Sequence, residues 1–120
     1  MRSLAELSQI VRGFRDERDW KQFHTPKDMV LSLLLEAGEL AEHFQWKSDD
    51  QSWEYLQEKK EEVSDEIADI FYWVLLVSHD FGIDLEQALQ SKMAKNREKY
   101  PIERSRGKST KYSSLKDENE

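Results

Sequence analysis

Helical spacing of the apolar residues is the feature that most limits the fold of this chain. Only 4 Gly and 2 Pro interrupt its 120 residues, and no segment alternates apolar and polar residues as a half-buried strand would. Apolar residues recur three and four positions apart, which is the period of an amphipathic helix. The sequence therefore predicts an all-α fold, a four-helix bundle-like domain.

Capping residues predict where these helices begin. Ser3 and Glu6 fit a capping box, and Thr25 followed by Pro26 fits an N-cap with proline at the first helical position. Asp84 is a good N-cap for the last helix. The predicted helices span residues 3–19, 25–45, 53–80 and 85–100. We expect a loop at residues 46–53 and a stop signal for the third helix at Gly82.

Length and charge restrict the function. The length fits one domain, predicted over residues 1–103, with a flexible polar tail over residues 104–120. A net charge of -7 repels nucleic acid, and no apolar run is long enough to span a bilayer. The first 17 residues are too charged for a signal peptide, and there is no cysteine. We expect a cytoplasmic protein with no nucleic-acid and no membrane partner.

Two pairs of carboxylates lie beside the apolar stripes of the second and third helices. Glu36 and Glu39 form the first pair, and Glu66 and Asp69 form the second. Residues three apart point to the same side of a helix. Residues 40–65 suffice to end one helix, turn and bring an antiparallel helix back. The four carboxylates can then face one another across a helix pair.

Such a cluster of anions favours a divalent cation, because repulsion and desolvation would otherwise destabilise it. In a chain that is 36% charged, a single pair of this kind is usually a solvated surface, but two apposed pairs favour metal binding. A di-iron centre requires Glu-x-x-His, and no His here follows a Glu by three residues. Oxygen ligands fit magnesium, manganese or calcium, and magnesium usually acts together with substrate phosphates.

Cationic and aromatic residues are candidate partners of a phosphate ligand. Lys92, Asn96 and Lys99 share one side of the fourth helix, where they would serve equally well as a solvated basic helix end. Aromatic residues and a histidine gather near the ends of the second helix, where they could stack on a base or belong to the core. These residues are Trp20, Phe23, His24, Trp46 and Trp53.

The second helix is apolar on two sides, since Leu31 and Leu35 lie opposite its main apolar stripe. Residues 67–77 of the third helix are apolar nearly all round. Helices of this kind are buried on several sides, which indicates a subunit interface.

Four segments together resemble the MazG-like all-α nucleotide pyrophosphohydrolases, with the dCTP pyrophosphatase branch as the most similar type. They are RDWKQFHTP (18–26), EAGELAEHFQWK (36–47), EIAD (66–69) and SKMAKNREKYP (91–101). The resemblance covers residues 4–101 and implies magnesium-dependent cleavage of a nucleoside triphosphate between its α and β phosphates, with Mn²⁺ as a possible substitute. It also implies a homodimer or a dimer of dimers, and a role in cleaning the nucleotide pool.

The resemblance also implies roles for individual residues. Glu36, Glu39, Glu66 and Asp69 match the magnesium-binding carboxylates, and Glu39, or else Glu36, matches the general base. The residues that match the substrate site are Trp20, His24, Trp46, Lys47, Trp73, Lys92 and Asn96.

Departures from the family pattern concern the base. Val11 stands where a base-contacting histidine is expected, and Trp73 stands where a tyrosine is expected. The expected substrate is therefore a deoxynucleotide, dCTP first and dATP as an alternative. Two further hypotheses remain open, a non-catalytic helical oligomerisation module and a nucleotide sensor without turnover.

Overall fold

The computed structural model describes residues 1–109, and these are helical without a strand. The all-α prediction is confirmed. The chain divides into two compact units, one of residues Met1–Ile83 and one that starts at Asp84. The first unit contains α1 (Leu4–Glu17), the 3₁₀ turn η1 (Lys21–Phe23), α2 (Pro26–Phe44), α3 (Asp49–Glu58) and α4 (Lys60–Asp80). The second contains α5 (Leu85–Lys99) and α6 (Ile102–Ser105).

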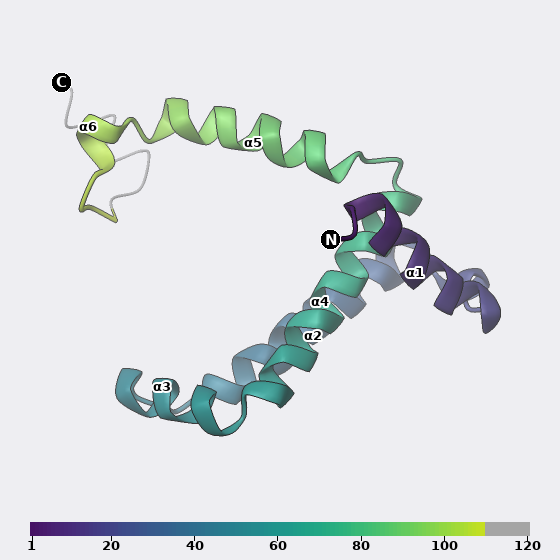
Figure 1. Ribbon diagram of the computed structural model, residues 1–120, viewed down its shortest axis with the longest axis horizontal. Helices are drawn as coiled ribbons and strands as arrows, with labels where there is room; N and C mark the ends of the chain where they lie inside the picture. The colour runs from purple at the N-terminus through teal and green to yellow at the C-terminus, as the bar shows by residue number, and fades with distance from the viewer. Residues whose placement is uncertain (110–120) are drawn as a thin grey trace. The chain divides into compact units, whose positions relative to one another are not determined.

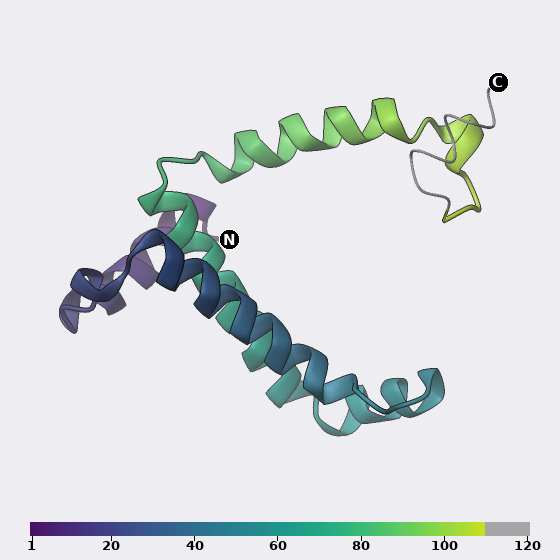
Figure 2. The same cartoon turned by 180° about the vertical axis from the view of Figure 1, so that it is seen from behind.

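An antiparallel pair of long helices, α2 and α4, forms the centre of the first unit (Figures 1 and 2). Helix α1 packs across the C-terminal end of α4. The most buried apolar side chains are Met29 on α2 and Val63, Leu75 and Leu76 on α4. The same pair of helices carries the four carboxylates, so burial of this core fixes the relative position of the acidic residues.

The capping residues expected from the sequence lie at the helix starts. Ser3 and Glu6 form the complete capping box of α1. The Thr25 hydroxyl accepts a hydrogen bond from the backbone N–H of Asp28. Past α4, Gly82 adopts a φ of 67°, the left-handed conformation that glycine reaches without a Cβ clash. Its N–H donates to the carbonyl of His79, which closes the end of the helix.

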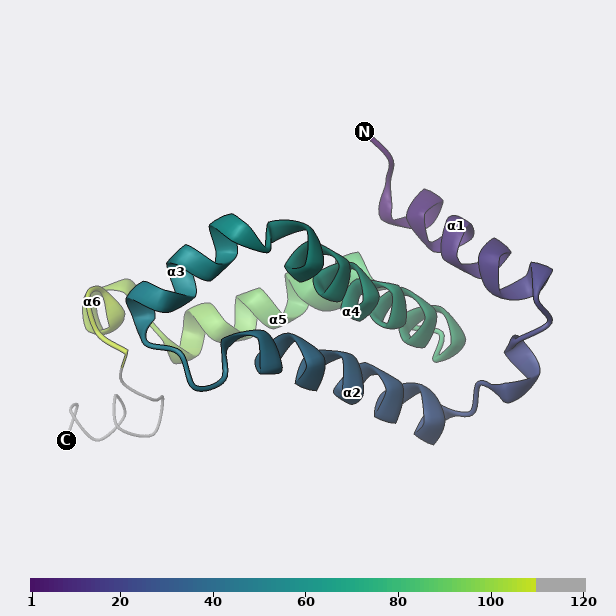
Figure 3. The same cartoon turned by 90° about the horizontal axis from the view of Figure 1, so that it is seen from below.

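The prediction of one helix over residues 53–80 is wrong. Helix α3 begins inside the expected loop, and Lys59, with a φ of −118°, separates α3 from α4 (Figure 3). Ser48 and Gln51 form a second capping box at the start of α3. The bend at Lys59 turns α3 so that Tyr55 reaches His43 on α2, a contact that a continuous helix would not make.

The second unit begins with a capped helix. The Asp84 carboxylate accepts a hydrogen bond from the N–H of Gln87, as expected of an N-cap. The predicted tail over residues 104–120 starts within α6, and its residues 110–120 lie outside the described part, so its flexibility stays a prediction. Across residues 1–109, no helix combines the length and apolarity needed to cross a bilayer.

Candidate metal and nucleotide site

Three glutamates from the central helix pair converge. Glu36 and Glu39 of α2 and Glu66 of α4 each offer a carboxylate oxygen, and these oxygens lie within 4.8 Å of one another. The antiparallel pairing of α2 with α4 produces this arrangement. Asp69, one turn further along α4, is outside the triad but lines a cavity together with Glu36. The structure thus brings the predicted carboxylates to one place, with Asp69 at its edge.

Burial and electrostatic repulsion both act on the protonation of this cluster. Partial burial, together with the neighbouring Glu39 and Asp69, raises the pKa of Glu36 to about 7. Burial and Glu39 also raise the pKa of Glu66. Without a cation the cluster therefore holds a proton near neutral pH, because the ionised carboxylates destabilise one another.

The donor set fits a hard divalent cation. One oxygen of Glu36 and one of Glu66 are buried, and neither finds a hydrogen-bond donor among the described residues. Buried carboxylate oxygens without a partner are costly, and a cation would satisfy them. Oxygen ligands alone, with no cysteine in the chain, suit magnesium or manganese.

An aromatic cavity of about 420 Å³ opens on one side of the carboxylates. Helices α1, α2 and α4 and the segment before α2 line it. The lining residues are Ile10, Val11, Phe14, Trp20, His24, Glu36, Asp69, Tyr72 and Trp73. The His24 ring packs on Trp73 with 5.1 Å between ring centroids. Flat apolar walls with a few polar atoms suit a nucleobase.

A smaller polar cavity of about 220 Å³ lies against the other members of the cluster, and Glu39 and Glu66 line it. His43 donates to or accepts from the Tyr55 hydroxyl through Nδ1, and its Nε2 lies 3.9 Å from Glu66. The Lys47 ammonium donates to the carbonyl of His43 at 2.6 Å and lies 4.3 Å from the Tyr55 ring centre. The Lys47 ammonium therefore places a positive charge in the same cavity as Glu39 and Glu66.

The predicted substrate residues fall into four places. Trp20, His24 and Trp73 line the aromatic cavity, whereas Lys47 lines the polar one. Trp46 is 92% exposed, with a φ of 70°, and lines neither cavity. The other two, Lys92 and Asn96, lie four residues apart on α5 in the second unit.

Sequence reasoning missed several residues of both cavities. Tyr72 follows Asp69 by three positions and His43 follows Glu39 by four, so helical spacing from the carboxylates could have found them. Tyr55 carried no such signal, because it lies on a helix that was expected to continue into α4.

Comparison with known proteins identifies the family of the chain. Residues 31–115 match the MazG-like family. The chain is 39% identical to dCTP pyrophosphatase 1 of Mus musculus over 115 residues, which is 94% of this chain and 68% of that protein. It is 36% identical to dCTP pyrophosphatase 1 of Homo sapiens, with the same coverage of each chain. A pyrophosphatase structure from Archaeoglobus fulgidus superposes with a TM-score of 0.79 at 41% identity, covering 84% of this chain and 94% of that one. An acidic cluster on two antiparallel helices, a family match over most of the chain and pyrophosphatase relatives thus converge, and the chain belongs to the MazG-like family.

Proposed function

We propose that this protein is a magnesium-dependent pyrophosphohydrolase that converts a deoxynucleoside triphosphate to its monophosphate and pyrophosphate. Its similarity to pyrophosphatases supports the assignment as a nucleoside triphosphate pyrophosphohydrolase. We propose dCTP as the preferred substrate, because the named relatives are dCTP pyrophosphatases, with dATP as the alternative. Such an enzyme would remove unwanted nucleotides from the pool.

The observation that carries this proposal is the position of the carboxylates between two unlike cavities. Glu36 and Asp69 face the aromatic cavity, and Glu39 and Glu66 face the polar one. A nucleotide has two unlike ends as well, a flat aromatic base at one end and charged phosphates at the other. We place the base beside Trp73 and the phosphates toward Lys47, so that the scissile bond lies at the carboxylates.

Glu36, Glu39, Glu66 and Asp69 would hold the cation. A bound divalent cation neutralises phosphate charge and lowers the pKa of water at the site. The raised pKa of Glu36 means that its carboxylate binds a proton near neutral pH. A bound cation would displace that proton and supply the positive charge instead. Mn²⁺ should substitute for Mg²⁺, because both accept the same oxygen ligands.

Glu39 is our choice for the general base. It is exposed and lines the polar cavity, where water and the leaving pyrophosphate have access. Water adds across the P–O bond between the α and β phosphates, and one of its protons passes to the Glu39 carboxylate. Lys47 would stabilise the charge that accumulates on the leaving pyrophosphate.

A panel of the common ribo- and deoxynucleoside triphosphates with Mg²⁺, assayed separately for pyrophosphate and orthophosphate, tests the function. We expect pyrophosphate and monophosphate in equal amounts, fastest from dCTP. Release of orthophosphate alone would contradict the proposal. If nucleotides bind without turnover, the sensor hypothesis holds; if neither nucleotide nor Mg²⁺ binds, the oligomerisation module holds.

Magnesium affinity should depend on pH. The folded-state pKa of Glu36 is raised, so below pH 7 a cation must displace a proton from it. One proton with a pKa of about 7 makes the apparent affinity about tenfold weaker at pH 6 than at pH 8. Calorimetric titration with Mg²⁺ in buffers of different ionisation enthalpy measures both the affinity and the released proton. An affinity independent of pH would show that Glu36 is not a ligand.

We also propose that the chain assembles as a homodimer or a dimer of dimers through the outer face of α2. Leu31, Leu34 and Leu35 are 44%, 65% and 67% exposed in a single chain. Exposed leucines in a row are a typical subunit interface. Leu35→Glu should lower the mass measured by light scattering while the helical circular dichroism is kept. Gln9→Glu, which adds the same charge on exposed α1, should leave the mass unchanged. An unchanged mass in both variants would rule out this face.

A further inference from the structure

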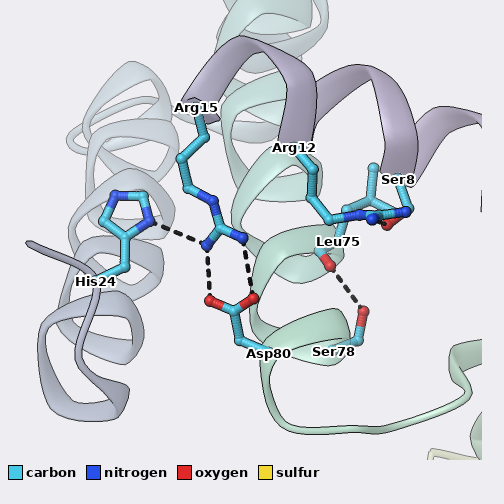
Figure 4. Close-up of polar contacts among 7 residues, drawn as sticks. All are labelled: Ser8, Arg12, Arg15, His24, Leu75, Ser78 and Asp80. Atoms are coloured by element: carbon cyan, nitrogen blue, oxygen red, sulfur yellow. Dashed lines mark hydrogen bonds and ion pairs between the residues drawn. The ribbon is translucent and has the colours of Figure 1, made fainter. Parts of the chain in front are cut away.

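A buried ion pair joins α1 to the end of α4, and it lies next to His24 (Figure 4). Arg15 NH1 lies 2.7 Å from Asp80 Oδ2, and NH2 lies 3.0 Å from Oδ1. The Arg15 side chain is 1% exposed and that of Asp80 is 13% exposed. This two-point geometry holds the guanidinium plane in one orientation.

Arg15 makes one more contact, with His24. Its NH1 lies 3.3 Å from His24 Nδ1 (Figure 4). A guanidinium can only donate hydrogen bonds, so Nδ1 must act as the acceptor. A neutral imidazole carries one proton, which then resides on Nε2.

The surroundings of His24 favour the neutral ring, although the negative charge of Asp80 acts in the opposite direction. Burial, and then the positive charge of Arg15, lower the pKa of His24. The hydrogen bond from Arg15 lowers the pKa of Asp80, and the same bond raises that of Arg15. These shifts favour the charged forms of Arg15 and Asp80 and the neutral form of the imidazole.

The remaining nitrogen of His24 is available to a ligand. Figure 4 shows the second ring nitrogen on the edge away from Arg15. The ring lies against Trp73 and lines the aromatic cavity, and it also lines a second cavity that it shares with Asp80. Among residues 1–83, the bond with Arg15 is the one hydrogen bond of the ring, so Nε2 has no acceptor there. Val11 is one of the apolar residues that line the same cavity.

We propose that Arg15 and Asp80 are positioning residues that hold His24 as the Nε2–H tautomer, so that the ring presents a fixed hydrogen-bond donor to a nucleobase. The recognised group is an acceptor on the base, a carbonyl oxygen or an unprotonated ring nitrogen. A base that presents an N–H group at this position is rejected, because two donors would meet in a partly buried site. The inference rests on the proposed function for its ligand, but the tautomer itself does not depend on turnover.

Long-range ¹H–¹⁵N correlation spectra of the full-length protein, without nucleotide, test the tautomer directly. We expect a protonated Nε2 and an unprotonated Nδ1 for His24. His79, which is exposed, provides an internal reference for a histidine ring in contact with solvent. A protonated Nδ1, or an averaged signal like that of His79, would overturn the proposal. This outcome is separable from failure of the proposed function, which the nucleotide panel decides.

Two substitutions of His24 test the donor in binding. In His24→Gln the longer side chain can place an amide N–H near the position of Nε2, whereas in His24→Asn the shorter one cannot. Loss of one hydrogen bond should raise the KM for dCTP about three- to tenfold in His24→Asn with little change in kcat. His24→Gln should recover most of this loss. Equal KM values for the two variants, or an unchanged KM in His24→Asn, would overturn the role of the donor.

A paired replacement tests the positioning residues. The double variant Arg15→Met/Asp80→Leu removes the donor to Nδ1 but leaves no unpaired buried charge, so the fold should persist. We expect the His24 signals to become averaged and the KM for dCTP to rise as in His24→Asn. A folded double variant that keeps the Nε2–H tautomer and the original KM would show that Arg15 and Asp80 do not position the ring. Should it not fold, the spectrum of the unmodified protein still decides the tautomer.

Discussion

Glu39→Gln should lower kcat for pyrophosphate release by about 10²–10⁴-fold, the usual contribution of a general base. The amide cannot take a proton from water, and it is a poorer ligand than a carboxylate. Asp69→Asn should reduce turnover as well, through weaker cation binding. Both effects are measured with saturating dCTP and Mg²⁺, and circular dichroism should show unchanged helix content.

The Glu39→Gln substitution should also stabilise the protein in the absence of metal. Glu39 raises the pKa values of Glu36 and Glu66, so removing its charge relieves repulsion in the folded state alone. A variant that is inactive yet unfolds at a higher temperature in chelator would separate a functional carboxylate from a structural one. Glu61→Gln, at an exposed position of α4 outside both cavities, is the matched control. Full activity in Glu39→Gln and Asp69→Asn would contradict the assignment of the site.

Asp80→Leu should destabilise the first unit by about 3–5 kcal/mol, because it leaves the buried Arg15 guanidinium without its counter-charge. Urea unfolding followed by circular dichroism measures this free energy. The effect should be far larger than that of removing an exposed ion pair, such as Arg18 with Glu17, which contributes about 0–1 kcal/mol.

The double variant Arg15→Met/Asp80→Leu should recover most of that loss. Apolar side chains of similar volume often replace a buried ion pair without cost. The coupling between the two sites, obtained from the single and double variants, should then be of the order of the single-variant loss itself. If the single variant loses less than about 1 kcal/mol, water reaches the Arg15 guanidinium in solution.

The sequence allowed the carboxylate cluster to be predicted because the needed information is local. Helical period alone places Glu36 with Glu39 and Glu66 with Asp69, and an antiparallel return is the simplest connection between the helices. Capping at Ser3, Thr25 and Asp84 could be predicted for the same reason, since a cap and its partner lie within one turn.

Features that depend on tertiary contacts could not be predicted in this way. No Gly or Pro marks the bend at Lys59 in the sequence. The capping box of Ser48 and Gln51 does indicate that a separate helix, α3, begins before the bend. Arg15 and Asp80 are 65 positions apart, and a buried charge on an otherwise apolar stripe gives no sign of its partner. Trp46 has a left-handed backbone just after α2 and an exposed side chain, so its expected place near the nucleotide stays a prediction.

The aromatic cavity and the carboxylate cluster draw on different helices, which affects how mutations act on each of them. Asp69 and Trp73 are four residues apart on α4, about 6 Å along its axis, and both line the aromatic cavity. One residue inserted between them would rotate the Trp73 side chain away from the side of the helix that carries Asp69. Ile10, Val11 and Phe14 reach the same cavity from α1, which supplies none of the carboxylates. If the aromatic cavity holds the base as proposed, mutation in α1 would alter base selectivity without changing the carboxylates.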